Sequence, residues 1–194
     1  MAVNGMKIIL GSQSKGRKKI LEEMGYDFEV IPPNIDEKSI RMDDPVKLAM
    51  ALANAKADAV ILQITNDSLL ITSDTVVIWR GSIREKPENE KEAREFLTSY
   101  TLDPAETVTA VVVVNSSNGK RAEGVDAARV WFKPIPEEVL MNYFATGDVF
   151  NKAGGFSVDH PLLENYVERI EGAPDSVIGL PKELTAKLIR ECLS

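Results

Sequence analysis

One carboxylate in the sequence occupies a position where a charge is unexpected. Asp74 follows Leu-Leu-Ile-Thr-Ser and precedes Thr-Val-Val-Ile, inside the most hydrophobic stretch of the chain. Buried carboxylates are rare unless they are ion-paired, bound to a metal or catalytic. A structural ion pair is therefore the alternative to catalysis at Asp74, and an Asp within such a strand also imitates a Walker B element.

Other charged side chains offer chemistry that matches this carboxylate. Lys56 lies in a segment rich in alanine and leucine, and Lys86 follows a short hairpin. Glu37 stands beside Asp36 in a polar loop. Two or more carboxylates hold a hard cation, and lysine or arginine neutralises phosphate charge. The set predicts a site for Mg²⁺ and a polyphosphate, although each residue alone is equally typical of a solvated surface or a helix cap.

A third group surrounds the first glycines of the chain. Gly11, four residues and then Gly16-Arg17-Lys18 have nearly the spacing of a Walker A loop, but Arg17 stands where the motif has Lys and Lys18 where it has a hydroxyl. Cations at a helix start oppose the helix dipole, and a bound anion reverses that penalty. The stretch predicts a phosphate site at a strand-to-helix turn, with a damaged P-loop and a solvated basic face as alternatives.

The composition removes several other kinds of chemistry. Cys192 is the only cysteine and His160 the only histidine, so an intrachain disulfide is impossible. Zinc sites and Ser-His-Asp triads normally need histidine or several thiolates. Catalysis is therefore expected from carboxylates, lysines, arginines and a metal held by oxygen, and Cys192 is expected to serve packing.

Length and charge bound the class of protein. At 194 residues with 44% hydrophobic residues, the chain fits one domain, or two small lobes that share a cleft. A net charge of -7 argues against a general nucleic-acid binder or a binder of anionic membranes. No apolar run approaches the ~18 residues of a membrane span, and the N-terminus lacks a secretory pattern. We expect a cytoplasmic protein.

Hydrophobic patterning predicts the elements that must position these residues. Strands are expected over 6–10, 27–31, 68–79, 82–84, 107–115, 127–132 and 164–170, and helices after residue 14 and over 45–62, 90–100, 136–147 and 181–192. A turn at 116–119 and a polar stretch over 120–126 are expected to form a long connection. Because strands and helices alternate early and hairpins follow, a mixed sheet flanked by helices fits best.

Seven motifs in order resemble one family. They are ILGSQSKGRKKIL, NIDEK, ANAKA, SDTVV, REKP, NKAGGF and DSVIGLP, spread from Ile8 to about Ile189. They resemble the Maf (septum-formation inhibitor) family of nucleoside triphosphate pyrophosphatases, which are related to the inosine triphosphate pyrophosphatases. The resemblance implies a single α/β domain over 1–194 with a bent mixed β-sheet flanked by helices, two lobes around a central cleft, and a homodimer. It also implies hydrolysis of a nucleoside triphosphate between its α- and β-phosphates.

The resemblance assigns roles position by position. It implies that Ser12 and Arg17 hold phosphate oxygens and that Lys56 and Lys86 grip the triphosphate. Glu37 would help to hold Mg²⁺, for which Mn²⁺ or Co²⁺ can substitute because oxygen ligands discriminate poorly among these ions. Asp74 would activate the attacking water, alone or while touching the metal.

The chain departs from the family pattern in three places. Gly16 replaces the first arginine of the first loop, and Lys15 or Lys18 is a candidate to supply the missing charge. Asp175-Ser176 stands where an Asn is usual. Asp159 appears where members that prefer thymidine or uridine carry a Gln.

Asp159 bears on the substrate, because an ionised carboxylate only accepts hydrogen bonds. It suits the N1–H and amino group of guanine, or a cationic base such as 7-methylguanine, and it would repel the carbonyls of uracil and thymine. A guanine-type nucleotide is therefore expected, with dTTP/UTP-type pyrimidine nucleotides as the alternative. Two other readings stay open: a P-loop kinase, and a non-catalytic nucleotide-binding regulator of cell division.

Overall fold

The computed structural model describes residues 5–194, so the first four residues, which belong to the N-terminal stretch without a secretory pattern, lie outside the account. Among the described residues, no helix combines the length and the apolar character that crossing a membrane would require. The cytoplasmic location stays a prediction.

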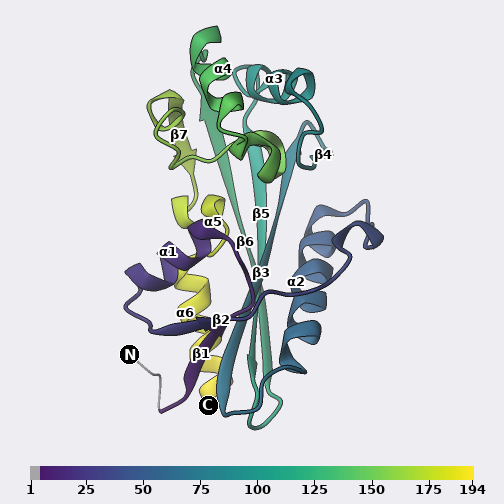
Figure 1. Ribbon diagram of the computed structural model, residues 1–194, viewed down its shortest axis with the longest axis vertical. Helices are drawn as coiled ribbons and strands as arrows, with labels where there is room; N and C mark the ends of the chain where they lie inside the picture. Colours follow the sequence, from purple (N-terminus) through teal and green to yellow (C-terminus); the bar gives the residue numbers. More distant parts are fainter. Residues whose placement is uncertain (1–4) are drawn as a thin grey trace.

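A seven-stranded mixed sheet forms the centre of the molecule (Figure 1). Its strands are β1 (Lys7–Leu10), β2 (Phe28–Val30), β3 (Ser68–Trp79), β4 (Ser82–Arg84), β5 (Ala105–Asn115), β6 (Arg121–Phe132) and β7 (Val167–Glu171). Their order is β2-β1-β3-β5-β6-β7, and β4 pairs with β3 in addition. β1 is parallel to both of its neighbours, and all other pairs are antiparallel. The predicted mixed sheet flanked by helices is confirmed.

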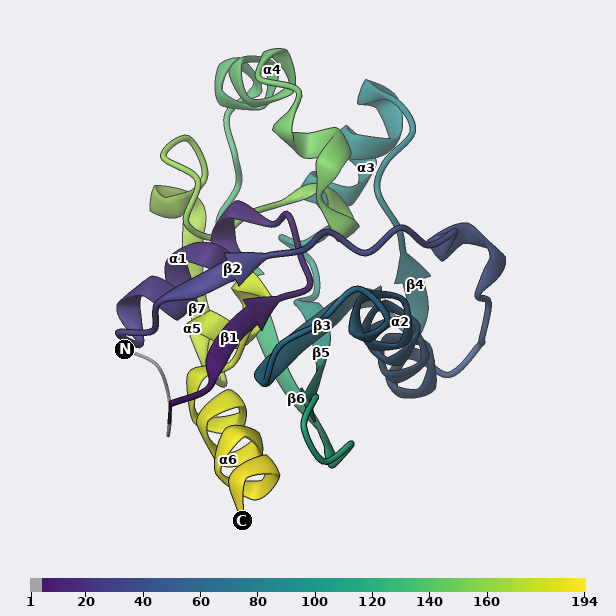
Figure 2. The ribbon, with the colours of Figure 1, turned by 60° about the horizontal axis from the view of Figure 1, so that its bottom comes forward.

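Helices cover both faces of this sheet (Figures 1 and 2). The helices are α1 (Lys15–Glu23), α2 (Pro45–Ile61), α3 (Glu90–Ser99), α4 (Glu137–Ala145), α5 (Pro174–Ile178) and α6 (Lys182–Leu193), with 3-10 turns η1 (Glu37–Ser39), η2 (Asp148–Asn151), η3 (Ala153–Gly155) and η4 (Glu164–Tyr166). α2 packs on one face, α1, α5 and α6 lie on the other, and α3 and α4 lie at the far end of the long strands. The single domain with two lobes around a cleft stays a prediction.

The apolar pattern of β3 explains why it lies at the centre. Its residues are buried on both faces, as the continuous hydrophobic run predicted. On one face Leu70 and Val76 pack against the alanine-rich side of α2, where Ala53 and Ala57 allow a close approach. On the other face Ile71 contacts the cluster formed with α1 and α6. β3 therefore carries any polar residue in its sequence into the interior.

The predicted bounds of two strands, β6 and β7, were wrong. β6 begins at Arg121 rather than at residue 127, so the connection after β5 is a short turn and not a long polar segment. The polar residues of 120–126 looked like a loop because one face of β6 is exposed to solvent, at Glu123 and Val125. Gly124 faces the other way, and a Cβ there would lie 2.5 Å from a methyl of Leu184, so α6 needs the glycine. The last strand starts at Val167, because 164–166 form the turn η4.

One edge of β3 is interrupted. β1 pairs with residues up to Ile71, β4 pairs from Val77 onward, and both lie on the edge opposite β5. Among residues 5–194, no strand pairs with the five residues Thr72–Val76 on that side. We call this interval the β3 gap. Asp74 is its central residue.

Candidate active site

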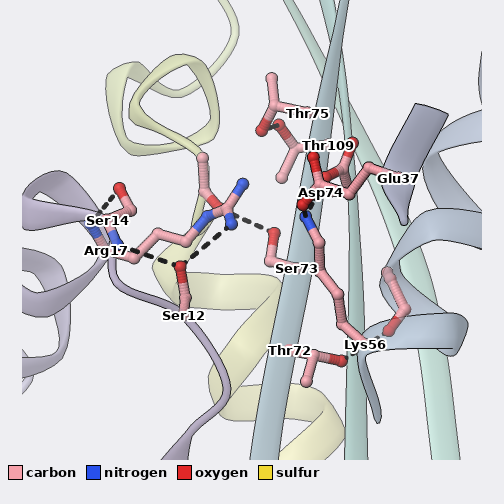
Figure 3. A network of polar contacts seen from close by, with 12 residues as sticks. Ser12, Ser14, Arg17, Glu37, Lys56, Thr72, Ser73, Asp74, Thr75 and Thr109 are labelled. Atoms are coloured by element: carbon pink, nitrogen blue, oxygen red, sulfur yellow. Dashed lines mark hydrogen bonds and ion pairs between the residues drawn. The ribbon is translucent and has the colours of Figure 1, made fainter. Parts of the chain in front are cut away.

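Three charged side chains meet on the α2 side of the β3 gap (Figure 3). Lys56 is only 5% exposed and Asp74 only 8%. The Lys56 ammonium donates a hydrogen bond to Asp74 Oδ1, and its Nζ lies 2.9 Å from Glu37 Oε1. We call Glu37, Lys56 and Asp74 the Lys56 cluster. The carboxylate in the apolar strand is thus ion-paired, as one alternative required, and Lys56 joins it to a second carboxylate, Glu37.

Local structure directs each member of the cluster to this point. α2 starts at Pro45, where the Asp44 side chain accepts hydrogen bonds from the first N–H groups of the helix. One turn before Lys56, the Ala53 carbonyl accepts a 2.8 Å bond from the Thr72 hydroxyl, which ties α2 to the β3 gap. The helix is therefore fixed against β3 at the level where Lys56 reaches Asp74.

The two adjacent carboxylates of the NIDEK motif have different tasks. Asp36 caps η1, because its side chain accepts from the Lys38 N–H at 3.1 Å. Glu37 projects toward Lys56 instead. Burial acts to raise the pKa of Glu37, but the charge and hydrogen bond of Lys56, with the nearby Lys86 and Arg17 charges, hold it below the ordinary value. Glu37 is therefore ionised at neutral pH and available to a cation.

A second group lies on the other face of β3, around Arg17. Arg17 Nη1 donates to Ser12 Oγ at 3.3 Å, and Nε donates to the Gly179 carbonyl at 2.9 Å. Ser14 caps α1 by accepting from the Arg17 N–H at 3.4 Å. Because a guanidinium has five N–H donors, some remain for a ligand. The strand-to-helix turn thus presents a helix start, a hydroxyl and a planar cation together, as an anion site requires.

Arg17 and the Lys56 cluster approach the β3 gap from opposite faces (Figure 3). Alternation along the strand turns Asp74 toward α2, and Ser73 and Thr75 toward the Arg17 side. Burial lowers the pKa of Arg17, while the nearby negative charges of Asp74 and Glu37 act to raise it. A ligand at the gap would have cations on both sides.

Sequence reasoning missed the part that α5 plays. The Gly179 carbonyl accepts from Arg17 and also from Ser73 Oγ at 2.8 Å. Gly179 has φ +110°, and a Cβ there would lie 3.0 Å from Thr75 Oγ1. Thr109 donates to the Ser176 carbonyl at 2.8 Å, so the 2.9 Å contact between Thr75 and Thr109 is donated by Thr75. The DSVIGLP motif contains both Ser176 and Gly179, so it marked this segment. The residue types alone could not show that the backbone carbonyls of these residues accept the hydrogen bonds.

The remaining predicted site residues lie at the margin. Lys86 is exposed and lies two residues after the end of β4. Val77 pairs with Arg84 in the antiparallel register, so a continuation of this register would place Lys86 opposite Thr75. Its charge acts on Glu37, so it lies near the cluster. Lys18 is half-buried on α1, and within residues 5–194 no hydrogen bond or ion pair joins its side chain to another predicted site residue.

Asp159 lies in a separate segment after η3. It is half-buried, and its Oδ1 accepts a 2.7 Å hydrogen bond from Ser157 Oγ. Its charge contributes to the raised pKa of Tyr143, behind the larger effects of burial and Asp148, and it also acts on Glu23. Among the described residues, no hydrogen bond or ion pair joins Asp159 to the Lys56 cluster.

Two departures from the family pattern have structural explanations. Asp175 Oδ2 accepts from the Lys182 N–H at 2.7 Å, so this carboxylate caps α6 at its first residue. Gly16 lies against α5, where a Cβ would meet Ile178 Cγ2 at 2.6 Å. The glycine is thus a packing requirement of this chain.

The carboxylates of the Lys56 cluster fit a magnesium ion that is shared with a substrate. Among the described residues, no group of three or more carboxylate, histidine or cysteine side chains gathers to hold a metal. Mg²⁺ is commonly bound through one or two carboxylates together with substrate phosphates and water. Glu37 and Asp74 each have one oxygen toward Lys56 and a second oxygen available, which matches that requirement.

A mixed α/β sheet that brings Arg17 and Lys56 to one interval of β3, with carboxylates beside them, is suited to bind a phosphate ligand together with a cation. The family model described as Maf-like protein matches residues 7–192. The chain therefore belongs to the Maf-like family, and the predicted membership is confirmed.

Curated relatives match along nearly the full length. A 7-methyl-GTP pyrophosphatase of Dictyostelium discoideum is 43% identical over 191 residues, 95% of this chain and 96% of that protein. A dTTP/UTP pyrophosphatase of Vibrio vulnificus (strain YJ016) is 33% identical over 185 residues, 95% of this chain and 98% of that protein. The predicted class, a nucleotide pyrophosphatase, is confirmed at the level of the family.

A solved structure is similar in part. The nucleoside-triphosphatase / dITP/XTP pyrophosphatase of Mycobacterium abscessus ATCC 19977 / DSM 44196 matches with a TM-score of 0.44 and 14% identity. The match covers 68% of this chain and 76% of that one. The description of the fold rests on the sheet itself.

Proposed function

We propose that the protein hydrolyses a nucleoside triphosphate between its α- and β-phosphates and releases the monophosphate and pyrophosphate. The observation that carries this proposal is the β3 gap, where Asp74 lies between Lys56 on one face and Arg17 on the other. A triphosphate carries negative charge along its length, so cations on two sides suit it, and a carboxylate between them can hold a divalent cation or activate water. The family membership supports the same reaction.

The chain's own residues account for the main steps. Arg17 and Ser12 bind phosphate oxygens from the α1 side, while Lys56 and Lys86 neutralise charge from the other side. A water molecule attacks the α-phosphorus, its oxygen forms the new P–O bond, and the bond to the bridging oxygen breaks. Asp74 takes the proton, and pyrophosphate leaves with the electron pair of the broken bond. Positioning and electrostatics carry most of the acceleration in phosphoryl chemistry.

A divalent cation is part of the proposal. Glu37 and Asp74 would hold Mg²⁺, with Mn²⁺ or Co²⁺ as substitutes, through the carboxylate oxygens that do not face Lys56. When bound, such an ion neutralises phosphate charge and lowers the pKa of nearby water. Lys18, on the outer side of α1, contributes long-range charge to the phosphate site rather than a direct contact.

Asp159 supports a guanine-type substrate, and 7-methyl-GTP in particular. Ser157 fixes one oxygen of the carboxylate, which leaves the other to accept from the N–H groups of a guanine edge or to face a cationic base. The name of the Dictyostelium relative agrees with this choice. The name of the Vibrio relative supports the second candidate, a pyrimidine triphosphate of the dTTP/UTP type.

A pyrophosphate-release assay with Mg²⁺ tests both the proposed reaction and the proposed base preference. The panel holds the normal ribo- and deoxyribonucleoside triphosphates, 7-methyl-GTP, ITP, pseudo-UTP and 5-methyl-UTP. Pyrophosphate with monophosphate is the expected product. Free phosphate would indicate transfer of the γ-phosphate, and tight binding without any product would identify a regulator.

Two variants, Asp159→Gln and Asp159→Asn, together test whether Asp159 determines the base preference. The Gln variant should lose preference for 7-methyl-GTP by about tenfold, since a hydrogen-bonding group that is left without its partner costs about 1–3 kcal/mol. It should gain relative activity on dTTP and UTP, while the Asn variant should lose the preference without that gain. An unchanged ranking in both variants would remove Asp159 from base recognition.

A further inference from the structure

Arg84 is a buried cation that the proposed reaction does not use. It is 7% exposed, and its guanidinium carbon lies 4.3 Å from the ring centroid of Trp79, 4.4 Å from that of Phe96 and 5.0 Å from that of Tyr100. It donates to the Phe96 carbonyl at 3.2 Å and to Ser99 Oγ at 2.6 Å. Within residues 5–194 no carboxylate forms an ion pair with it.

Such a cation is costly unless its surroundings compensate for lost water. Faces of aromatic rings supply part of the compensation, and a desolvated cation–π contact is worth about 2 kcal/mol. The planar guanidinium also stacks and donates at the same time, which an ammonium cannot do. The three rings and two acceptors therefore define one orientation for Arg84.

The cage around Arg84 continues into the glycine segment that follows η2. The Tyr100 hydroxyl, beside Arg84, donates to the Gly154 carbonyl at 3.0 Å. The Gly154 N–H donates to the Glu85 carbonyl at 3.0 Å. Gly154 has φ +67°, and a Cβ there would lie 2.9 Å from the Tyr100 hydroxyl. Gly154 is thus held on both sides by the neighbours of Arg84.

This arrangement connects two parts of the proposed site. Glu85 directly precedes Lys86, which serves the phosphates, and Gly154 leads within five residues to Asp159, which serves the base. We propose that Arg84 is a positioning residue whose aromatic cage sets Lys86 and Asp159 at a fixed separation, matched to the phosphate and base ends of one nucleotide. The proposal rests on the function proposed above.

Arg84→Met tests it, because Met keeps length and apolar contact but loses the charge and the planar fork. A displacement of about 1 Å at a positioning residue costs up to about 10²-fold. We expect KM for 7-methyl-GTP to rise about tenfold, kcat to change less, and the preference for 7-methyl-GTP over UTP to fall. Arg84→Lys should keep only part of the wild-type affinity and substrate preference, since an ammonium does not stack on aromatic rings as a guanidinium does.

Arg80→Met is the matched control. Arg80 lies over the same Trp79 ring at 4.6 Å, but it is exposed and forms an ion pair with Asp103. Among the described residues, no hydrogen bond or ring contact joins it to Tyr100 or Gly154. KM and the substrate ranking should stay as in the wild type.

Tyr100→Phe removes only the hydroxyl that reaches Gly154 and leaves a ring for Arg84. Like Arg84→Met, it should lower the preference for 7-methyl-GTP over UTP. The double variant with Arg84→Met should have the same KM and the same preference as Arg84→Met alone. If Arg84→Met does not fold, Tyr100→Phe decides the question by itself.

Amide hydrogen exchange separates this proposal from the enzymatic one. Peptides that cover 151–160 should exchange faster in Arg84→Met and Tyr100→Phe than in the wild type or Arg80→Met. Unchanged exchange together with unchanged KM and ranking would overturn the positioning role. A wild type that hydrolyses no nucleotide would instead overturn the proposed function, and the exchange data would still decide whether Arg84 holds the segment.

Discussion

Lys56 forms ion pairs with two carboxylates at once, and this shapes what the site can do. A buried ion pair is weak support for stability, because desolvation offsets much of the attraction. A phosphate that reaches Lys56 would compete with Asp74 and Glu37 for the ammonium. Substrate binding would therefore free carboxylate oxygens for a cation and a water at the moment they are needed.

Asp74→Asn separates catalysis from structure at this position. A general base is worth about 10²–10⁴-fold, so kcat should fall by about that factor. The fold should persist because Glu37 still pairs with Lys56. Pyrophosphate release and the thermal midpoint are the measurements, with Asp58→Asn as a control that breaks only the ion pair between Asp58 and Arg121 at the surface of α2. Near-normal turnover would make Asp74 structural and leave Glu37 as the candidate base.

Among the elements, the contact between α1 and α5 governs the phosphate site. α1 carries Arg17, and α5 ends at Gly179, whose carbonyl orients that guanidinium. Gly16 lets the two helices approach at Ile178. Gly16, which stands where the family pattern has an arginine, thus allows a closer contact between α1 and α5.

Gly16→Ala and Gly16→Arg should both destabilise the protein. A Cβ at 2.6 Å from Ile178 Cγ2 forces a shift, and overpacking of this kind costs about 1–3 kcal/mol. Activity should fall with stability, because α5 also orients Arg17. Ile178→Ala in the Gly16→Ala background should return part of both. Thermal unfolding and steady-state kinetics measure this, and a Gly16→Arg variant with higher activity and unchanged stability would contradict it.

Elements were predictable where the hydrophobic pattern was strong along their whole length. β3 and α2 carried clear apolar patterns, and Asp74 and Lys56 stood out as exceptions to them. The start of β6 was hidden because its exposed face reads as a loop. Arg84 and Gly179 were invisible as site components, since one acts through aromatic rings distant in sequence and the other through a carbonyl.

At the scale of the whole molecule, the core of residues 5–194 consists of three apolar clusters. They lie between α2 and the sheet, between α1, α6 and the sheet, and under α3 and α4. The site lies where the first two meet β3. The homodimer that the resemblance implies stays a prediction.

Removal of divalent cations should therefore abolish turnover and spare the structure. With a chelator, pyrophosphate release should fall to background, and Mg²⁺, Mn²⁺ or Co²⁺ should restore it. The thermal midpoint without nucleotide should move by less than about 1 °C, because at the ion concentrations of an assay a weakly held cation contributes little linkage energy. Loss of secondary structure on chelation would reveal a structural ion and overturn this view.

The β3 gap has a consequence for association between molecules. An unpaired strand edge usually invites another chain to add a strand, which is a route to aggregation. Here β1 and β4 flank the open interval at both ends, so an added strand would have to fit between them. The charge of Asp74 at the centre discourages a peptide further. The same interruption that admits a small anionic ligand thereby closes the middle of the sheet to self-association.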